Sequence, residues 1–445
     1  PSTQPRAEGL GFSGSFASDG RPSRRALLWP VMARVYFAEK AAIHVYSMDT
    51  RTGALTALGP PVEQDGAGSF LAPSADGRFL YAIAKPGAAA FRVDGASGGL
   101  THINTVKCDI SGNAHISVAS IGSSGLVLLA AYGGGGVNVL RIRPDGGLCD
   151  AEPGASKQHT GGSNVYQPAE GNEQEQAHPH SCFVDPTRRW ALVSDLGQDK
   201  IYVYAIDLAA GKLSEHAVLD TAPGSGPRHL CFHPRLPFAY GINELDCTVN
   251  VYAFDAGAEK VLGPILQTTS TLPAGYNNRD HGNAKNAAGD PASGPNRPMQ
   301  TNATADIHVT PDGRFLLGSN RGHDSLVCYS IKKDGQLELV GFTYVKGEHP
   351  RNFSIHPSGR WVLVANQDSG NVVVFKLDRR TGELTPADVD VKVKTARCVS
   401  WAVPQQKLKK TDLDHREQNP ARRQRRERLC ESHLRHSNRG PATLA

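Results

Sequence analysis

Residues 226–246 read GPRHLCFHPRLPFAYGINELD and contain two short alternating runs of apolar and polar residues on either side of a proline turn. The runs cover residues 229–233 and 238–243. Alternation of this kind predicts β-strands, and a short turn between two strands makes them antiparallel. Arg228 precedes the first strand and Glu244 follows the second. Both side chains are therefore expected at the same end of a hairpin.

Five further copies of this unit occur along the chain. They read APSADGRFLYAIAKPG, ASIGSSGLVLLAAYGG, VDPTRRWALVSDLGQD, TPDGRFLLGSNRGHDS and HPSGRWVLVANQDSGN. Outside two longer connections, successive turns are roughly 45–50 residues apart, a period typical of propeller repeats. Each copy is followed by a third alternating run, such as KIYVYAI or NVVVFKL, and then by a fourth.

A seventh copy is divided between the ends of the repeat region. Residues 35–58 supply only its later strands, and residues 396–403 supply only a first strand. A four-stranded sheet buries both of its faces by stacking against neighbours, and pairing the two ends removes exposed sheet edges. The sequence therefore predicts an all-β fold, a seven-bladed β-propeller of four-stranded antiparallel blades in one domain at residues 33–403, closed by its N- and C-terminal strands.

Both ends of the chain differ in composition from the repeats. Residues 1–32 are rich in Ser, Gly and Arg, and residues 404–445 contain KLKK and ARRQRRER, so we expect a disordered extension and a basic disordered tail. Such a tail is an alternative site for nucleic acid or an anionic surface. Because the tail carries much of the net charge of +5, the charge of the repeats gives no reason to expect a nucleic-acid partner.

The composition of the repeats also bears on compartment and partners. No apolar run approaches the roughly 20 residues of a membrane span, so no membrane partner is expected. The eight cysteines form no CxxC pair, and several lie in strand-like runs. Buried free thiols favour a reducing compartment, so we expect a cytoplasmic protein. We also expect a monomer or a weak dimer.

The repeat register places particular side chains on one rim of the disc. The starts of first strands and the ends of second strands share one face, and the first strand of each blade borders the central channel. Aligned on the turn, these positions hold His180, Arg228, Glu244, Arg321, Arg351 and Arg397. The other aligned positions are Ser69, Lys85, Gly133, Leu196, Ala305 with Asp306, and Gln367, with His115 close to its position if one residue is inserted.

The chemistry of this rim suits an anionic ligand. Guanidinium groups bind carboxylate or phosphate with two parallel hydrogen bonds. A carboxylate near a histidine can activate water, and an arginine beside a lactone carbonyl can stabilise the oxyanion that forms on attack. Concentrated positive charge disfavours a bound cation, so we predict no metal and no cofactor. These groups would open or close a lactone ring without a metal.

Several segments resemble the lactonase family of seven-bladed propellers, which includes bacterial 6-phosphogluconolactonase and the fungal 3-carboxy-cis,cis-muconate lactonizing enzyme. They are HPHSCFVDP, GPRHLCFHP followed by NEL, ADIHVTPDGRFL followed by NRG, and HPRNFSIHPSGRW, and the resemblance covers nearly all of residues 33–403. The resemblance implies that His180, Arg228, Glu244 and Arg321 are the catalytic residues. Our candidates for binding substrate are Arg351, Arg397, Asp306 and His178.

Three functions are compatible with this rim. The first is metal-independent hydrolysis of 6-phosphogluconolactone in the pentose phosphate pathway, with Glu244 or His180 as the base toward water. The second is a muconate-type cycloisomerase that binds carboxylates, and the third is a non-catalytic propeller that binds a protein. Purely structural roles are the alternatives for some of these residues. Glu244 and Arg321 would form a salt bridge between loops, His178 would be exposed to solvent, and His308 would be a histidine of the core.

Two connections between repeats are much longer than the others. They cover residues 153–177 and 268–304, lack apolar periodicity and are predicted to be loops on the rim that holds Arg228. In the second, Tyr276, Arg279 and His281 would either contact substrate or decorate the surface.

Overall fold

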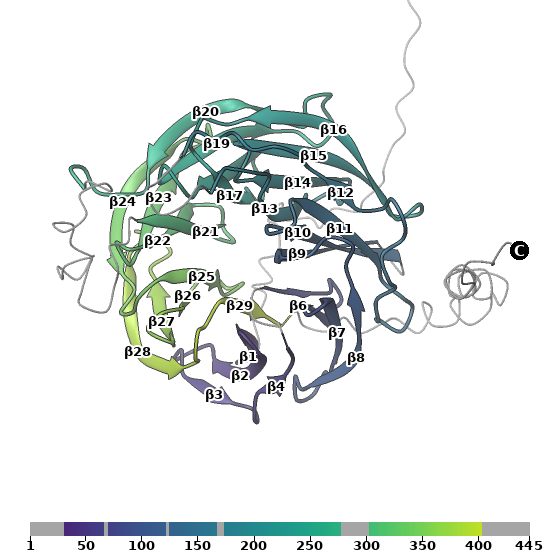
Figure 1. Cartoon of the computed structure of the whole chain (residues 1–445). Coiled ribbons are helices and arrows are strands. Elements are labelled where there is room, and N and C mark those ends of the chain that lie inside the picture. The colour runs from purple at the N-terminus through teal and green to yellow at the C-terminus, as the bar shows by residue number, and fades with distance from the viewer. Residues whose placement is uncertain (1–30, 66–69, 122–123, 167–172, 277–301, 403–445) are drawn as a thin grey trace, which may run out of the picture.

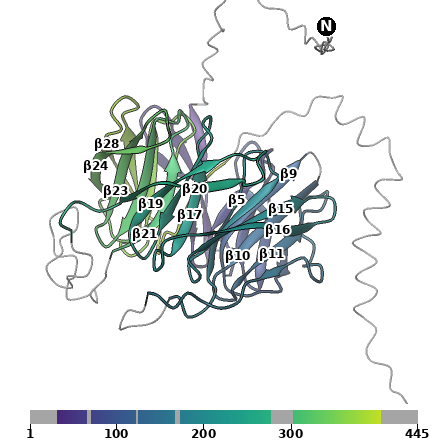
Figure 2. The same cartoon turned by 90° about the horizontal axis from the view of Figure 1, so that it is seen from above.

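The computed structural model describes residues 31–65, 70–121, 124–166, 173–276 and 302–402. Within these ranges the chain forms strands and turns and no helix. Seven antiparallel sheets stand around a central axis, seen along that axis in Figure 1 and at right angles to it in Figure 2. The predicted seven-bladed propeller is confirmed.

The blade that contains residues 226–246 shows the plan of the others. It consists of β17 (Pro227–Phe232), β18 (Phe238–Asn243), β19 (Thr248–Phe254) and β20 (Leu262–Ser270), hydrogen-bonded in that order. The first strand, β17, lies next to the first strands of the neighbouring blades, so it borders the axis.

The other complete blades follow the same order. The first two are β5 (Leu71–Pro73), β6 (Phe79–Ala84), β7 (Gly87–Val93), β8 (Leu100–Lys107), and β9 (Asn113–Ile121), β10 (Ser124–Ala131), β11 (Gly136–Arg141), β12 (Lys157–Gln158). The next is β13 (Pro179–Val184), β14 (Trp190–Asp195), β15 (Lys200–Asp207), β16 (Lys212–Asp220). The last two are β21 (Ala303–Val309), β22 (Phe315–Arg321), β23 (Ser325–Ile331), β24 (Leu337–Tyr344), and β25 (Pro350–Ile355), β26 (Trp361–Asn366), β27 (Asn371–Leu377), β28 (Leu384–Lys392).

The closing blade joins strands from both ends of the described chain. Its strands are β29 (Cys398–Trp401), β1 (Met32–Glu39), β2 (Ala42–Asp49), β3 (Leu55–Ala57) and β4 (Val62–Glu63). The first strand, β29, pairs antiparallel with β1, and both short strands β3 and β4 pair with β2. The ring is therefore closed as predicted, with an outer strand that is split in two. The expected extension and tail lie almost entirely outside the described residues.

The two long connections are not loops throughout. Lys157 and Gln158, inside the predicted loop 153–177, form β12 and pair with Gly136 and Val137. The predicted loop 268–304 begins within β20 and ends within β21, and most of what lies between is outside the described residues. Apolar periodicity could not reveal β12 because two residues are too few to show a period.

Apolar side chains fill the spaces between neighbouring sheets. In one such layer Tyr240 and Val251 of one blade lie among Ile307, Leu316 and Val327 of the next, all fully or almost fully buried. Each large apolar side chain buried in this way contributes about 1.5–3 kcal/mol relative to an exposed one. Stacking of blades therefore supplies the stability that a single four-stranded sheet lacks.

Two turns have the sequence pattern TGxL, TGAL at residues 52–55 and TGEL at residues 381–384, and their glycines allow neighbouring blades to approach closely. Gly53 has φ 84°, and a Cβ there would lie 2.8 Å from the ring of Trp361 in the adjacent blade. Gly382 has φ 85°, and its Cβ would lie 2.7 Å from the ring of Phe315. Only glycine allows both the left-handed backbone and this close approach. These turns therefore also form contacts between neighbouring blades.

Candidate active site

A β-bulge interrupts the innermost strand of five blades at matching positions near the start of the strand. In β17, Pro227 pairs with Asn243 and His229 with Ile242, which leaves Arg228 as the extra residue. The same irregularity leaves Ala114, His180 and Arg351 extra in their strands, and places Ala305 and Asp306 together opposite Ser319. Because a bulge re-aims a side chain, this device directs His180, Arg228 and Arg351 into the mouth of the channel.

Arg228, Glu244 and Arg321 form a buried ion cluster across two blades. Arg228 Nε donates to Glu244 Oε2 at 2.7 Å, and Arg321 Nη2 donates to Glu244 Oε1. Burial alone would raise the pKa of Glu244, but the charges of Arg321 and Arg228 outweigh it and lower this pKa to about 2. Glu244 is therefore a fixed counterion that orients two guanidinium groups, and such a carboxylate is a poor base.

Two further arginines at this mouth have no counterion among the described residues. The Arg351 side chain makes no hydrogen bond or ion pair with any described residue, and Arg397 Nε is buried without a described partner. Burial and the charges of Arg228 and Arg321 lower the pKa of Arg351 to about 9. We call the group formed by Arg228, Arg321, Arg351, Arg397 and His180, whose charges act on one another, the basin. Its excess of positive charge calls for an anion.

His180 is the uncharged member of the basin. Its side chain is buried, and its Nδ1 has no hydrogen-bond partner among the described residues. Burial, followed by the charge of Arg228, holds the pKa of His180 well below its ordinary value. The imidazole is neutral and lies beside Arg228, so it is a possible proton acceptor, but its Nδ1 is closed to solvent.

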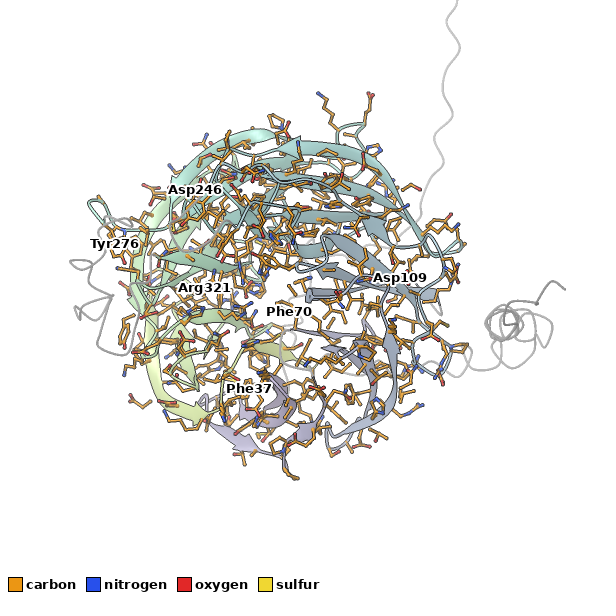
Figure 3. All side chains as sticks on the ribbon, viewed as in Figure 1. Phe37, Phe70, Asp109, Asp246, Tyr276 and Arg321 are labelled. Carbon is orange, nitrogen blue, oxygen red and sulfur yellow. The ribbon has the colours of Figure 1, made fainter. Side chains whose placement is uncertain are left out.

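A second layer of side chains lies below the bulges. His229 Nδ1 donates to Asp306 Oδ1 at 2.8 Å, and Arg228 Nη1 approaches His229 Nε2 at 3.4 Å. Rings fill the centre of this layer, with Phe70 4.3 Å and Phe183 4.5 Å from His115 between ring centroids. Figure 3 shows Phe70 at the centre of the ring. Aromatic rings therefore pack directly beside the basin residue His180, through its contact with His229.

Asp306, predicted to bind substrate, belongs to this lower layer and is fully engaged by protein. Five nitrogens donate to its carboxylate, from the side chains of His229, His308 and Asn352 and the backbone of Ile307 and Phe353. It is 1% exposed. Since no lone pair remains for a ligand, we assign Asp306 to holding His229, and through it Arg228. The sequence alignment gave Ala305 and Asp306 for the same rim position. The bulge places both opposite Ser319, and the Asp306 carboxylate points into the lower layer.

His308 and His178 also differ from the simplest expectations. His308 Nε2 lies 3.0 Å from Asp306 Oδ2, and its side chain is 34% exposed, so it is not a core histidine. Burial would lower the pKa of His308, but the charge of Asp306 raises it. His178 is buried rather than solvent-exposed, because its Nδ1 bonds to the backbone oxygen of Tyr132 at 2.7 Å.

The alignment of the repeats on their turns did not identify Tyr132 as a residue of this rim. The last paired residues of β10, β18 and β22 precede turns of equal length, so Tyr132 is the structural equivalent of Glu244 and Arg321. The expected residue, Gly133, is one position too late. The run of glycines from 133 to 136 hid the end of the strand, although the constant turn length would have located it.

Residues from the long connections contribute unevenly. The ring of Tyr276 contacts His323 edge-on at 5.1 Å and lies near the outer edge of the propeller (Figure 3). It therefore does not reach the basin. Arg279, His281 and the aligned Ser69 lie outside the described residues.

The buried neutral histidines predict acid instability. The histidines with lowered pKa are His115, His180, His229, His233, His323, His349 and His356. The unfolded chain binds these protons first as pH falls below 6.5, so stability is complete above that pH and is lost toward the folded pKa values. For His229, whose pKa burial and Arg228 lower to about 4, the loss is about 3 kcal/mol.

Thermal unfolding measured from pH 7.5 to 4.5 should show a melting temperature that decreases steadily below pH 6.5. His308 has a raised pKa and therefore stabilises the folded protein as the pH falls, but it is one residue against seven with lowered pKa values. A constant melting temperature over this range would contradict the assignment of neutral histidines.

The described residues contain neither a metal-binding cluster nor a membrane-spanning helix. No group of three or more His, Cys, Asp or Glu side chains among them is placed to hold a metal ion, and the absence of a metal stays a prediction. They contain no helix long and apolar enough to cross a membrane.

The fold and the basin define a propeller with a central site for an anionic molecule. The profile of the family described as "Lactonase, 7-bladed beta-propeller" matches residues 32–401, and the chain belongs to this family. A 6-phosphogluconolactonase of Formosa agariphila is 33% identical over 354 residues, 77% of this chain and 90% of that protein. One of Bacillus subtilis is 31% identical over 370 residues, 81% of this chain and 94% of that protein.

Solved structures agree with this assignment. A periplasmic gluconolactonase of Pseudomonas aeruginosa superposes with a TM-score of 0.71 at 28% identity, covering 84% of this chain and 99% of that one. A Lactobacillus plantarum protein gives a TM-score of 0.70 at 29% identity, covering 83% and 99%. The chain is therefore a lactonase, an enzyme and not a binding scaffold.

Proposed function

We propose that this protein hydrolyses 6-phosphogluconolactone to 6-phosphogluconate, a step of the pentose phosphate pathway, in the cytoplasm and without a metal. The observation that carries the proposal is the basin, where two guanidinium groups without described counterions face a neutral His180 and an oriented Arg228. A phosphorylated sugar lactone has the matching parts, an anionic end and a carbonyl open to attack. Relatives named 6-phosphogluconolactonase support the choice of substrate.

The arginines divide the binding work. Arg351 and Arg397 are placed to bind the phosphate, since neither is neutralised by a described residue. Arg228 uses Nε for Glu244 and Nη1 for the backbone oxygen of Ala305 at 2.6 Å, which leaves Nη2 without a hydrogen bond to any described residue. Nη2 is therefore the donor available to the lactone carbonyl.

Hydrolysis then follows from these positions. A water oxygen attacks the carbonyl carbon while His180 takes one of its protons, and the carbonyl electron pair becomes an oxyanion that Arg228 stabilises. Collapse of this intermediate breaks the ring C–O bond, and the imidazolium returns the proton to the departing ring oxygen. Of the two candidate bases, we assign His180, because both oxygens of Glu244 are held by arginines.

Arg351→Met should separate binding from stability. The variant is expected to raise KM for 6-phosphogluconolactone about 10–100-fold, the loss of one charge-assisted contact to phosphate. It should also raise the free energy of unfolding by about 0.5–2 kcal/mol, because it removes repulsion with Arg228 and Arg321. Steady-state kinetics and thermal unfolding of one preparation give both values. An unchanged KM would place the phosphate elsewhere.

The proposal is tested with the purified full chain and freshly made 6-phosphogluconolactone, followed against its spontaneous decay. Acceleration that depends on protein concentration is expected. No acceleration, with turnover of 3-carboxy-cis,cis-muconate in a parallel assay, would identify the cycloisomerase instead.

A further inference from the structure

One wall of the basin carries no positive charge. Tyr132 follows β10 at the position that Glu244 and Arg321 occupy in their blades, and its ring lies edge-on to His180 with 5.5 Å between centroids. Along the closed ring, the blade of Tyr132 is separated from that of Arg397 by the blade β5–β8, and from that of Arg351 by the blade β5–β8 and the closing blade. The free guanidinium groups and Tyr132 therefore face the basin from different sides.

The Tyr132 ring is held firmly from behind. It stacks on His178 with 4.3 Å between centroids and 18° between planes. His178 is fixed in turn, since its Nδ1 bonds to the Tyr132 backbone oxygen, its backbone nitrogen donates to Asp195 Oδ1 at 2.8 Å, and its Nε2 lies 3.4 Å from Glu175 Oε1. His178, predicted to bind substrate, thus positions Tyr132 instead.

The first long connection is part of this support. Its residue Gln174 is completely buried and donates to the Leu196 backbone oxygen at 2.9 Å and to Asp199 Oδ1 at 2.8 Å. Gln174 fixes the segment that carries Glu175 to the rim. The connection therefore shapes the wall of the basin behind Tyr132.

The Tyr132 hydroxyl is available to a ligand. It makes no hydrogen bond to any described residue, and burial followed by the charge of Glu244 raises the pKa of this phenol, so it stays a neutral donor. A carboxylate placed against it would meet the negative charges of Glu244, Glu173 and Glu175, which outnumber the one positive charge, that of Arg228, acting at this hydroxyl. A sugar hydroxyl carries no such penalty and can accept a hydrogen bond from the phenol.

We propose that the Tyr132 hydroxyl binds a hydroxyl group of the substrate, so that the basin selects a polyhydroxylated lactone with one anionic end over a polycarboxylate. This inference rests on the proposed function and extends it. The phosphate would bind to Arg351 and Arg397, the lactone carbonyl to Arg228, and a ring hydroxyl to Tyr132. Tyr132 is then a residue that determines substrate specificity. The alignment of the repeats had assigned its position to the next residue, Gly133.

Tyr132→Phe removes a single oxygen atom and tests this contact. The matched control is Tyr202→Phe on β15, whose hydroxyl donates to Gln198 Oε1 at 2.6 Å away from the basin. With 6-phosphogluconolactone, Tyr132→Phe should lower kcat/KM about 10-fold, the loss of one neutral hydrogen bond, and the control should behave as wild type. Equal melting temperatures of Tyr132→Phe and wild type would show that the fold is intact.

Deoxy analogues of the substrate identify the partner of the phenol. Three phosphorylated lactones are compared, each lacking the 2-, 3- or 4-hydroxyl group. For the analogue that lacks the partner of the phenol, Tyr132→Phe and wild type should have the same kcat/KM, because the contact is absent in both. A Tyr132→Phe variant equal to wild type on the parent lactone, or weakened to the same extent on the parent and on every analogue, would overturn the proposal.

Binding of the product distinguishes this inference from the proposed function. If the wild-type protein fails to hydrolyse the lactone, the proposed function is wrong, and calorimetric titration with 6-phosphogluconate still tests Tyr132. About 10-fold weaker binding by Tyr132→Phe supports the contact without turnover. Equal affinities of the two proteins overturn it.

Discussion

Arg228→Met is expected to lower kcat/KM for 6-phosphogluconolactone by about 10²–10³-fold, the cost of removing one oxyanion donor. Methionine preserves much of the side-chain volume but donates no hydrogen bond. Arg321 continues to pair with Glu244 in the variant, so the blade contact persists while the donor is lost. Initial rates of the variant and the wild type over the spontaneous rate give the comparison.

The control for this variant lies in the same blade. Arg235→Met changes an exposed arginine at the turn between β17 and β18, on the opposite rim. It should leave kcat/KM at the wild-type value. Equal losses in the two variants, or full activity in Arg228→Met, would remove Arg228 from the mechanism.

Asp306→Asn is expected to reduce the free energy of unfolding by about 3–5 kcal/mol, because it removes a buried carboxylate and leaves its donors without a charged acceptor. The variant leaves His308 without its anion and places an amide nitrogen among five donors. Activity should also fall, since His229 would no longer hold Arg228. Denaturant unfolding and steady-state kinetics measure the two effects.

A carboxylate in the same hairpin supplies the comparison. Asp312, in the turn between β21 and β22, pairs with Arg379 at 3.3 Å on the surface. Asp312→Asn should cost at most about 1 kcal/mol, as exposed pairs do. A cost for Asp306→Asn no larger than that of Asp312→Asn would show that the lower layer is not the support we describe.

Sequence periodicity predicted the fold because each blade repeats one local pattern. The turns with DGR and SGR, the TGxL turns and the divided seventh copy each correspond to a contact between strands or blades. The same register brought Arg228, Glu244 and Arg321 to one rim, where the structure places them in direct contact. A simple alternation of side chains was sufficient for this result.

Details finer than the repeat were not predictable from that alternation. A bulge adds one residue to a strand without a clear signal in composition, and it decides whether Ala305 or Asp306 faces the basin. Glycine has no side chain to mark which face it belongs to, so the glycines after Tyr132 concealed the end of β10. The strand β12 forms through pairing with β11, a long-range contact that its own two residues do not encode.

The most direct measurement of the central claim is a crystal structure of the protein with 6-phosphogluconate bound. The phosphate is predicted to lie on Arg351 and Arg397, and the carboxylate, which stands where the lactone carbonyl reacts, between Arg228 and His180. Binding of the molecule outside the basin, or with its carboxylate remote from both Arg228 and His180, would contradict the account.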